Sequence, residues 1–303
     1  MLHFIHQKRI LRNWDLYLLL IPVLAFYLLF HYGPMYGVQL AFKKFMPIKG
    51  IDGSPWVGLT HFIRFFNSPY FNRLLWNTLS LSLLQLAFGF PLPILLALMI
   101  NEVSNVRYKK IVQNITYAPH FISTVVIVGL IRSFVNLDYG IVNTFIRALG
   151  GEGANYLIKP DWFRPLYVGT SVWQNAGWNS IIYIAALSGV DPQLHESAMI
   201  DGANHYQCVW HINMPSILPT IVIMLILNVG SIMNVGFEKA FLMQNDLNLR
   251  VSDIISTYSY RLGIQGAQYD FATAIGLFNS VINCILLVLV NTISRRVGET
   301  SLW

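Results

Sequence analysis

Long apolar runs constrain the fold of this chain more than any other feature of its sequence. A bilayer core is about 30 Å thick, so a helix needs about 20 mostly apolar residues to cross it. Lipid offers no hydrogen-bond partner to the backbone, so a continuous apolar run of this length has to be helical. The sequence therefore predicts an all-α membrane protein with six transmembrane helices, at approximately Leu16–Tyr32, Leu79–Ile100, Tyr117–Phe134, Leu166–Leu187, Ile217–Val235 and Phe271–Ile293.

The composition leaves little room for a separate soluble domain. Hydrophobic residues make up 55% of the 303 residues and charged residues 11%, whereas a soluble domain carries about 25% charged residues. We therefore expect one transmembrane domain over residues 1–303. The formal net charge of +6 fits either attraction to anionic lipid headgroups or an acidic solute. Cys208 and Cys284 lack metal-ligand spacing, so neither a disulfide nor a zinc site is predicted.

Basic residues near the spans indicate the orientation of the chain. Lys and Arg accumulate in cytoplasmic loops, chiefly in short loops and close to the membrane ends. The long first loop also carries basic residues, but several of them lie away from the membrane. The remaining ones predict that both termini, and with them the polar segment between the fourth and fifth spans, are cytoplasmic: Lys8, Arg9, Arg12, Arg107, Lys109, Lys110, Arg295 and Arg296.

That polar segment, residues 191–215, is predicted to form a helix–turn–helix. The Asp-Pro dipeptide at its start is a helix signal, because Asp can cap the first turn and proline suits the first helical position. Gly202 suits the left-handed residue that ends a helix, a second helix is expected from His205, and Glu196 would face water. An interfacial amphipathic helix is the alternative, but such helices carry basic residues and this segment has none. The apolar residues expected to face the helix bundle are Leu194, Ala198, Met199, Val209 and Ile212.

The spacing within this segment resembles the EAA loop of bacterial ABC-importer permeases. The family pattern is E-A-A-x3-G-x9-I-x-L-P. This chain has Glu196–Ala198, three residues, Gly202, nine residues and then Ile212–Pro215. Ser197 replaces an alanine and Met214 replaces a leucine, and every spacing matches.

The resemblance extends over most of the chain. Residues 56–79 and 101–123 are similar to stretches of carbohydrate permeases and of their LplB-like polysaccharide branch, which includes permeases for pectic and alginate oligosaccharides. It implies the type I ABC importer permease fold, in which the EAA loop at 191–215 is a coupling helix that docks into a cytoplasmic ATPase. The match, with the typical DGA tripeptide included, implies this role for Glu196, Ser197, Ala198, Asp201, Gly202 and Ala203.

The resemblance also implies the partners of the chain. They are a second homologous permease subunit, two cytoplasmic ATPase subunits, an extracytoplasmic solute-binding protein, an oligosaccharide substrate and the lipid of a bacterial plasma membrane. The sequence has no phosphate-binding G-x-x-x-x-G-K-[ST] loop. ATP and Mg²⁺ are therefore expected at the partner ATPase, and neither a cofactor nor a nucleic acid is expected on this chain.

Polar side chains within the predicted spans are candidates for the solute path. Amides and hydroxyls inside a span are costly unless they face a cavity or another helix. Hydrogen bonding between helices is the alternative role for all of them, and it is the favoured role for the pair in the sixth span. The candidates are Ser171, Gln174, Asn175 and Trp178 in the fourth span, Asn228, Ser231, Asn234 and Val235 in the fifth, and Asn279 and Asn283 in the sixth.

Two other functions compete with a transport subunit. An intramembrane enzyme needs a motif such as H-E-x-x-H or G-x-S-x-G, and the sequence has neither. A self-sufficient channel or secondary carrier usually shows charged or broken spans at mid-depth. We expect a non-catalytic permease subunit that alternates between inward-facing and outward-facing states. The net charge and the branch resemblance favour an acidic oligosaccharide, such as an alginate fragment, over a neutral or pectic one.

Overall fold

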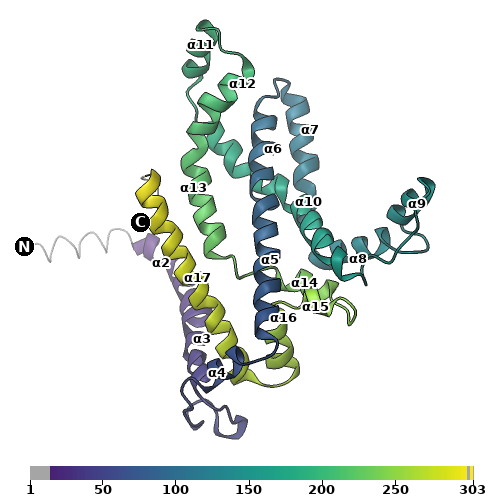
Figure 1. Ribbon diagram of the computed structural model, residues 1–303. Coiled ribbons are helices and arrows are strands. Elements are labelled where there is room, and N and C mark those ends of the chain that lie inside the picture. Colours follow the sequence, from purple (N-terminus) through teal and green to yellow (C-terminus); the bar gives the residue numbers. More distant parts are fainter. Residues whose placement is uncertain (1–13, 299–300, 303) are drawn as a thin grey trace, which may run out of the picture. The chain divides into compact units, whose positions relative to one another are not determined.

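A computed structural model describes residues 14–298 and 301–302 of the chain. Lys8, Arg9 and Arg12, which support the predicted orientation, lie outside these residues. The described part consists of helices joined by short connections (Figure 1), with two isolated β-bridges and no strand. The predicted all-α fold is confirmed.

The apolar stretches of the sequence all fall in helices. Four helices in the described part are long and apolar enough to cross a membrane: Leu16–Phe42, Phe71–Asn101, His205–Gly230 and Tyr269–Arg296. A fifth crossing is added if the pair Val106–Phe121 and Thr124–Phe134, which bends by 99°, is one broken span. The remaining predicted span lies in α10 (Pro160–Leu187), whose 28 residues are sufficient in length. Amide and hydroxyl side chains make this helix more polar than the other four.

The chain divides into two compact units. Unit 1 comprises Met1–Phe66 and Leu262–Leu277, and unit 2 comprises Asn67–Arg261 and Phe278–Trp303. In unit 1, His61 lies 3.6 Å (Nε2–Oδ2) from Asp270. The described helices of unit 1 are α2 (Trp14–Tyr27), η1 (Leu28–Tyr32), α3 (Gly33–Met35), η2 (Tyr36–Phe42), η3 (Pro47–Lys49), α4 (Thr60–Phe66), most of η6 (Arg261–Gln265) and the first part of α17 (Tyr269–Gly298).

Unit 2 is built around α10, which packs against α5, α6, α7 and α13. One apolar cluster contains Phe163 and Tyr167 from the first part of α10, and a second contains Tyr183 and Leu187 from its last part. Ser171, Gln174 and Asn175 of α10 lie between the residues that it contributes to these two clusters. The helices of unit 2 are α5 (Phe71–Gly89), α6 (Pro91–Asn101), α7 (Val106–Tyr117), η4 (Ala118–Phe121), α8 (Thr124–Phe134), α9 (Ile141–Ala148), α10, α11 (Pro192–Ile200), α12 (His205–Cys208), η5 (Val209–Asn213), α13 (Met214–Gly230), α14 (Phe237–Met243), α15 (Leu249–Ser252), α16 (Ile255–Tyr260) and the last part of α17.

The fifth span ends earlier than the sequence predicts. The prediction extends it to Val235, but α13 ends at Gly230 and the next six residues leave the helix. The Ser82 hydroxyl donates to a carbonyl of this non-helical stretch, and the Asn283 side chain accepts one of its backbone N–H groups at 3.0 Å. Side chains of neighbouring helices thus satisfy the freed backbone groups, as a membrane interior requires.

The third predicted span, Tyr117–Phe134, is broken rather than straight. The break lies between η4 and α8, at Ile122 and Ser123. Pro119 lies just before it and cannot donate a backbone hydrogen bond. Ser123 then starts α8 as its N-cap, accepting a first-turn N–H at 3.4 Å. This local chemistry explains a bend that the apolar pattern alone does not reveal.

Candidate functional site

The segment between α10 and α13 has the helix–turn–helix structure that its sequence predicts. The Asp191 side chain caps α11, accepting the N–H of Gln193 at 2.9 Å. Gly202 ends the first helix with a φ of 85°, a conformation that glycine adopts without a steric penalty. Asn204 and Gln207 then form a capping box at the start of α12. Three local signals therefore fix the shape of this segment, which we call the coupling loop (residues 191–215).

The coupling loop presents both charge and apolar surface. Glu196 is exposed, as predicted. The prediction that the apolar side chains pack on the bundle is wrong for Leu194 and Met199, which are 50% and 60% exposed. The reason is their place in the fold, because α11 lies at one end of unit 2, beyond α6 and α7 (Figure 1). A hollow of about 330 Å³ between α11 and α12 is lined by Ala198, Asp201, Gly202, Ala203, Gln207, Cys208, His211 and Ile212.

Hydrogen bonds attach the coupling loop to the end of α6. His195 Nε2 lies 2.8 Å from Asn213 Oδ1, and Asn213 Nδ2 donates to Glu102 Oε1 at 3.1 Å. The other oxygen of Glu102 lies 2.9 Å from His205 Nδ1. One carboxylate thus contacts the second helical piece of the loop directly, and α11 through Asn213 and His195.

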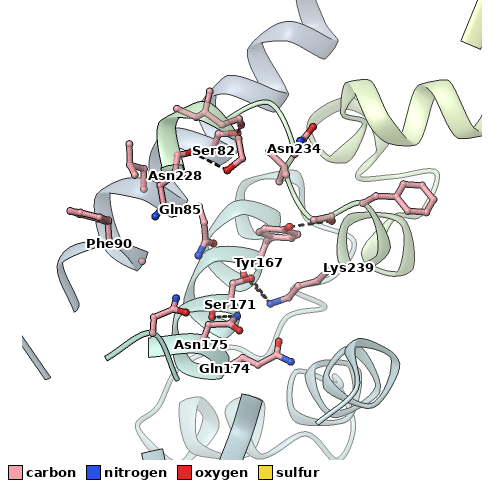
Figure 2. A pocket seen from close by; sticks show the side chains of 18 of the residues that line it. Ser82, Gln85, Phe90, Tyr167, Ser171, Gln174, Asn175, Asn228, Asn234 and Lys239 are labelled. Atoms are coloured by element: carbon pink, nitrogen blue, oxygen red, sulfur yellow. Dashed lines mark hydrogen bonds between the residues drawn. The ribbon is translucent and has the colours of Figure 1, made fainter. Parts of the chain in front are cut away.

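A polar cavity of about 440 Å³ lies at the middle of α10. Helices α5 and α10 contribute to it, together with the end of α13 and the stretch leading into α14 (Figure 2). Seven predicted path residues line it: Ser171, Gln174, Asn175, Asn228, Ser231, Asn234 and Val235. The structure therefore brings together the two polar faces that the sequence predicts on separate spans.

Backbone carbonyls orient the amides of this cavity. Asn175 Nδ2 donates to Ser171 O at 2.9 Å, and Asn228 Nδ2 donates to Met224 O at 2.8 Å. Gln174 Nε2 donates to a carbonyl at the break before α8, at 2.9 Å. Fixed amides and hydroxyls around an open volume are the groups that sugar hydroxyls need as hydrogen-bond partners.

Residues 89–299 match the family described as binding-protein-dependent transport system inner membrane components. The chain belongs to this family.

Individual relatives agree with this assignment. The permease is 44% identical to the polygalacturonan/rhamnogalacturonan transport system permease protein YteP of Bacillus subtilis (strain 168), over 97% of this chain and 92% of that protein. It is 45% identical to the protein LplB of the same organism, over 96% of this chain and 92% of that protein. The crystal structure of a bacterial ABC transporter involved in the import of the acidic polysaccharide alginate matches with a TM-score of 0.89 and 45% identity, covering 96% of this chain and 99% of that chain.

These matches confirm the resemblance to carbohydrate permeases and the permease fold. They support a transport subunit over a self-sufficient carrier or an intramembrane enzyme. The permease is a non-catalytic, multi-pass subunit of a bacterial inner-membrane ABC importer, which works with a solute-binding protein and with a separate ATPase subunit. Within residues 14–298 and 301–302, no three His, Cys, Asp or Glu side chains are grouped to hold a metal ion.

Three predicted path residues of the permease lie outside the cavity lining. Trp178 stacks on His120, with ring centroids 4.5 Å apart, one turn further along α10. Asn279 donates to the Asn234 side chain at 2.9 Å, and Asn283 accepts the backbone N–H of Met233. The two asparagines of α17 thus hydrogen-bond to the non-helical stretch after α13, a structural role of the kind that the sequence favours for them.

Lys239 is a charged residue of the cavity lining that the sequence analysis did not single out. It is only 6% exposed, and its Nζ donates to Ser171 Oγ at 2.7 Å and to Tyr167 O at 3.1 Å. It belongs to α14, outside the candidate spans, and burial lowers the pKa of Lys239 to about 7. From the sequence alone, a lysine that follows a glutamate just after a predicted span is expected to be solvated together with that glutamate. The non-helical stretch that ends at Gly236, the N-cap of α14, and the acceptors on α10 together place Lys239 inward.

Proposed function

We propose that the permease moves acidic oligosaccharides through the polar cavity at the middle of α10. The cavity, lined by amides, hydroxyls, one buried ammonium and the exposed carboxylate of Glu238, carries this proposal. Two relatives support the substrate class, because one is named for polygalacturonan and a structural neighbour imports alginate. Both polysaccharides are polymers of uronic acids. An alginate or pectic fragment is therefore favoured over a neutral oligosaccharide.

The path residues of this proposal divide into two groups. Ser171, Gln174, Asn175, Asn228, Ser231, Asn234 and Val235 would face the moving solute. Trp178, Asn279 and Asn283 lie outside the cavity lining and would hold the surrounding elements in place. Both compact units would form one transmembrane permease domain over residues 1–303.

The coupling loop would receive the force of ATP hydrolysis. Its exposed carboxylate and uncovered apolar side chains suit a basic and partly apolar cleft in an ATPase. The residues proposed for this contact are Glu196, Ser197, Ala198, Asp201, Gly202 and Ala203. This role requires the loop and both termini to be cytoplasmic, and ATP and Mg²⁺ would bind to the ATPase alone.

The assembly would contain a second homologous permease and two ATPase subunits. A solved alginate transporter is in complex with an alginate pentasaccharide-bound periplasmic protein, which supports solute delivery by a binding protein here. A ligand shifts a two-state transporter only through its different affinities for the two states. The loaded binding protein and the nucleotide-bound ATPase would therefore favour the same state, so that binding of the loaded protein would raise ATP turnover.

The test is ATP turnover by the reconstituted complex with its binding protein. Acidic oligosaccharides should raise turnover, and Glu196→Lys should abolish both this stimulation and the association of the ATPase. The matched control is Glu152→Lys, which reverses an exposed carboxylate in the loop after α9 and should leave turnover unchanged. Normal turnover in Glu196→Lys would contradict the coupling role. The absence of a response to every oligosaccharide would contradict the transport role.

A further inference from the structure

Lys239 is a buried cation whose contacts in the described residues are all neutral. Its ammonium donates to a hydroxyl and to a backbone carbonyl, and it lies 5.1 Å from the centre of the Tyr167 ring. No carboxylate lies within 4.0 Å of it in the part of the chain that the structure describes. An ammonium has three N–H donors, and the two acceptors satisfy two of them.

The surroundings of Lys239 make a cation there costly. Removing a charge from water without a counter-charge is unfavourable, and an opposite charge offsets this cost only at close range. The titratable groups beside it are the Tyr167 phenol on α10 and the carboxylate of Glu238 on α14. Tyr167 donates to Gly236 O at 3.2 Å, and Glu238 is exposed. The cavity thus contains a partly desolvated cation with no carboxylate within 4.0 Å among the described residues, and the exposed carboxylate of Glu238 lines the same cavity.

The ammonium lies on the wall of the cavity. Figure 2 shows the Lys239 side chain extending from α14 to α10, with its nitrogen beside Ser171. Ser171 lines the cavity together with Asn175 and Gln174, one turn further along α10. A sugar carboxylate could therefore reach the ammonium while the amides bind the hydroxyls of the same sugar unit.

We propose that Lys239 is a specificity-determining residue, whose ammonium pairs with a carboxylate of the transported oligosaccharide and selects uronic-acid units over neutral sugar units. This inference rests on the proposed function. A carboxylate would supply the missing counter-charge and a third acceptor in a partly desolvated site, where charge-assisted hydrogen bonds are strongest. Neutral sugars would leave the cation unpaired, so the residue would discriminate against them as well as favour acidic ones.

The test compares two matched substrates in the reconstituted complex. One is a uronic-acid tetrasaccharide, and the other is the same molecule with its carboxylates reduced to primary alcohols. Transport into proteoliposomes is measured for the wild type and for Lys239→Gln, with both sugars at saturating binding protein. For each permease, the rate for the acidic sugar is divided by the rate for the reduced sugar, and the two quotients are compared. The same binding protein delivers both sugars to the wild type and to Lys239→Gln, so its own preference cancels in this comparison.

We expect the preference for the acidic sugar to fall by about tenfold or more in Lys239→Gln, because the loss of one hydrogen bond to a charged group weakens binding by about this factor. Transport of the reduced sugar should be unchanged or faster, and Lys239→Arg should retain most of the preference. Lys159→Gln, which removes an exposed cation just before α10, is the matched control and should behave as the wild type. Melting temperatures check that each variant is folded.

Two results would overturn the inference. An unchanged ratio would show that Lys239 does not contact the carboxylate, and an equal loss for both sugars would assign it a structural role only. Lys239→Met, which keeps the length of the side chain, must give the same ratio as the glutamine variant. These failures differ from failure of the proposed function, in which the wild-type complex would transport neither sugar.

Discussion

Gly177 of α10 offers a quantitative test of how tightly α10 packs against α7. A Cβ added at Gly177 would clash with the carbonyl oxygen and carbon of Thr116, at distances well inside the 3.0 Å that real Cβ atoms keep. The obstacle is backbone rather than the end of a flexible side chain. Gly177→Ala therefore requires the two helices to separate locally by about 1 Å, in an interior packed nearly as densely as a crystal.

The energetic cost follows from two opposing terms. Overpacking of a dense interior costs about 1–3 kcal/mol, and a backbone obstacle places this site in the upper part of that range. Alanine returns about 1 kcal/mol through its higher helix propensity. The expected net loss is about 2 kcal/mol, equivalent to a melting temperature about 4–8 °C lower for a domain of this size.

The assay is thermal unfolding of the purified transporter complex, followed by tryptophan fluorescence. Gly169→Ala is the matched control, because Gly169 lies on the same helix and an added Cβ there meets, outside the adjacent backbone of that helix, no atom of the described residues within 4 Å. This control should unfold at or slightly above the wild-type temperature, since it gains up to about 1 kcal/mol of helix propensity. If Gly177→Ala melts together with Gly169→Ala, the proposed close packing of α10 on α7 is incorrect.

Three further outcomes can be tested in the same complex. Asp253→Asn should destabilise the permease by about 2–3 kcal/mol, which is less than the loss of a wholly buried ion pair. The reason is that Asp253 is fully buried, while its partners Arg261 (2.6 Å) and Arg73 (3.6 Å) are each 35% exposed. An unchanged melting temperature would contradict this. Gly202→Ala should cost about 1 kcal/mol of strain at a φ of 85° and should weaken ATPase stimulation more than sugar binding, and normal stimulation would disprove it. Burial lowers the pKa of Lys239 to about 7, so the affinity for uronate should be highest below this pH and should fall by up to about tenfold per pH unit above it. Lys239→Arg, which stays charged, should show no such decline. Identical pH profiles for the two proteins would refute the assignment.

Local chemistry explains why some elements were predictable from the sequence. The coupling loop is defined by Asp191, Gly202 and Asn204, which act on their immediate neighbours and need no tertiary context. The polar faces of α10 and α13 were also predictable, because a membrane interior leaves few roles for a buried amide. Their convergence on one cavity follows from these two helices lying side by side in unit 2.

Long-range contacts explain what the sequence did not reveal. The end of α13 at Gly230 depends on Ser82 and Asn283, which are distant in sequence and supply hydrogen bonds to the non-helical stretch. Lys239 is similar, because its inward direction depends on a turn and on acceptors in α10 rather than on its neighbours in the chain. The wrong orientation predicted for Leu194 and Met199 has the same origin, since a periodic apolar pattern cannot indicate whether the covering surface belongs to this chain or to a partner.

The helix that begins within the coupling loop runs continuously from His205 to Gly230, over 26 residues. At 1.5 Å per residue it is about 39 Å long, with one end in the coupling loop and Asn228 near the other end. Docking of the ATPase on the coupling loop, as proposed, would make this helix a lever arm. Tilting such a helix by about 5° around its coupling-loop end would displace the other end by about 3 Å, which is comparable to the length of a hydrogen bond. The displacement at the cavity would then be set by the length of this helix, so that removing one turn from α13 would reduce the displacement in proportion.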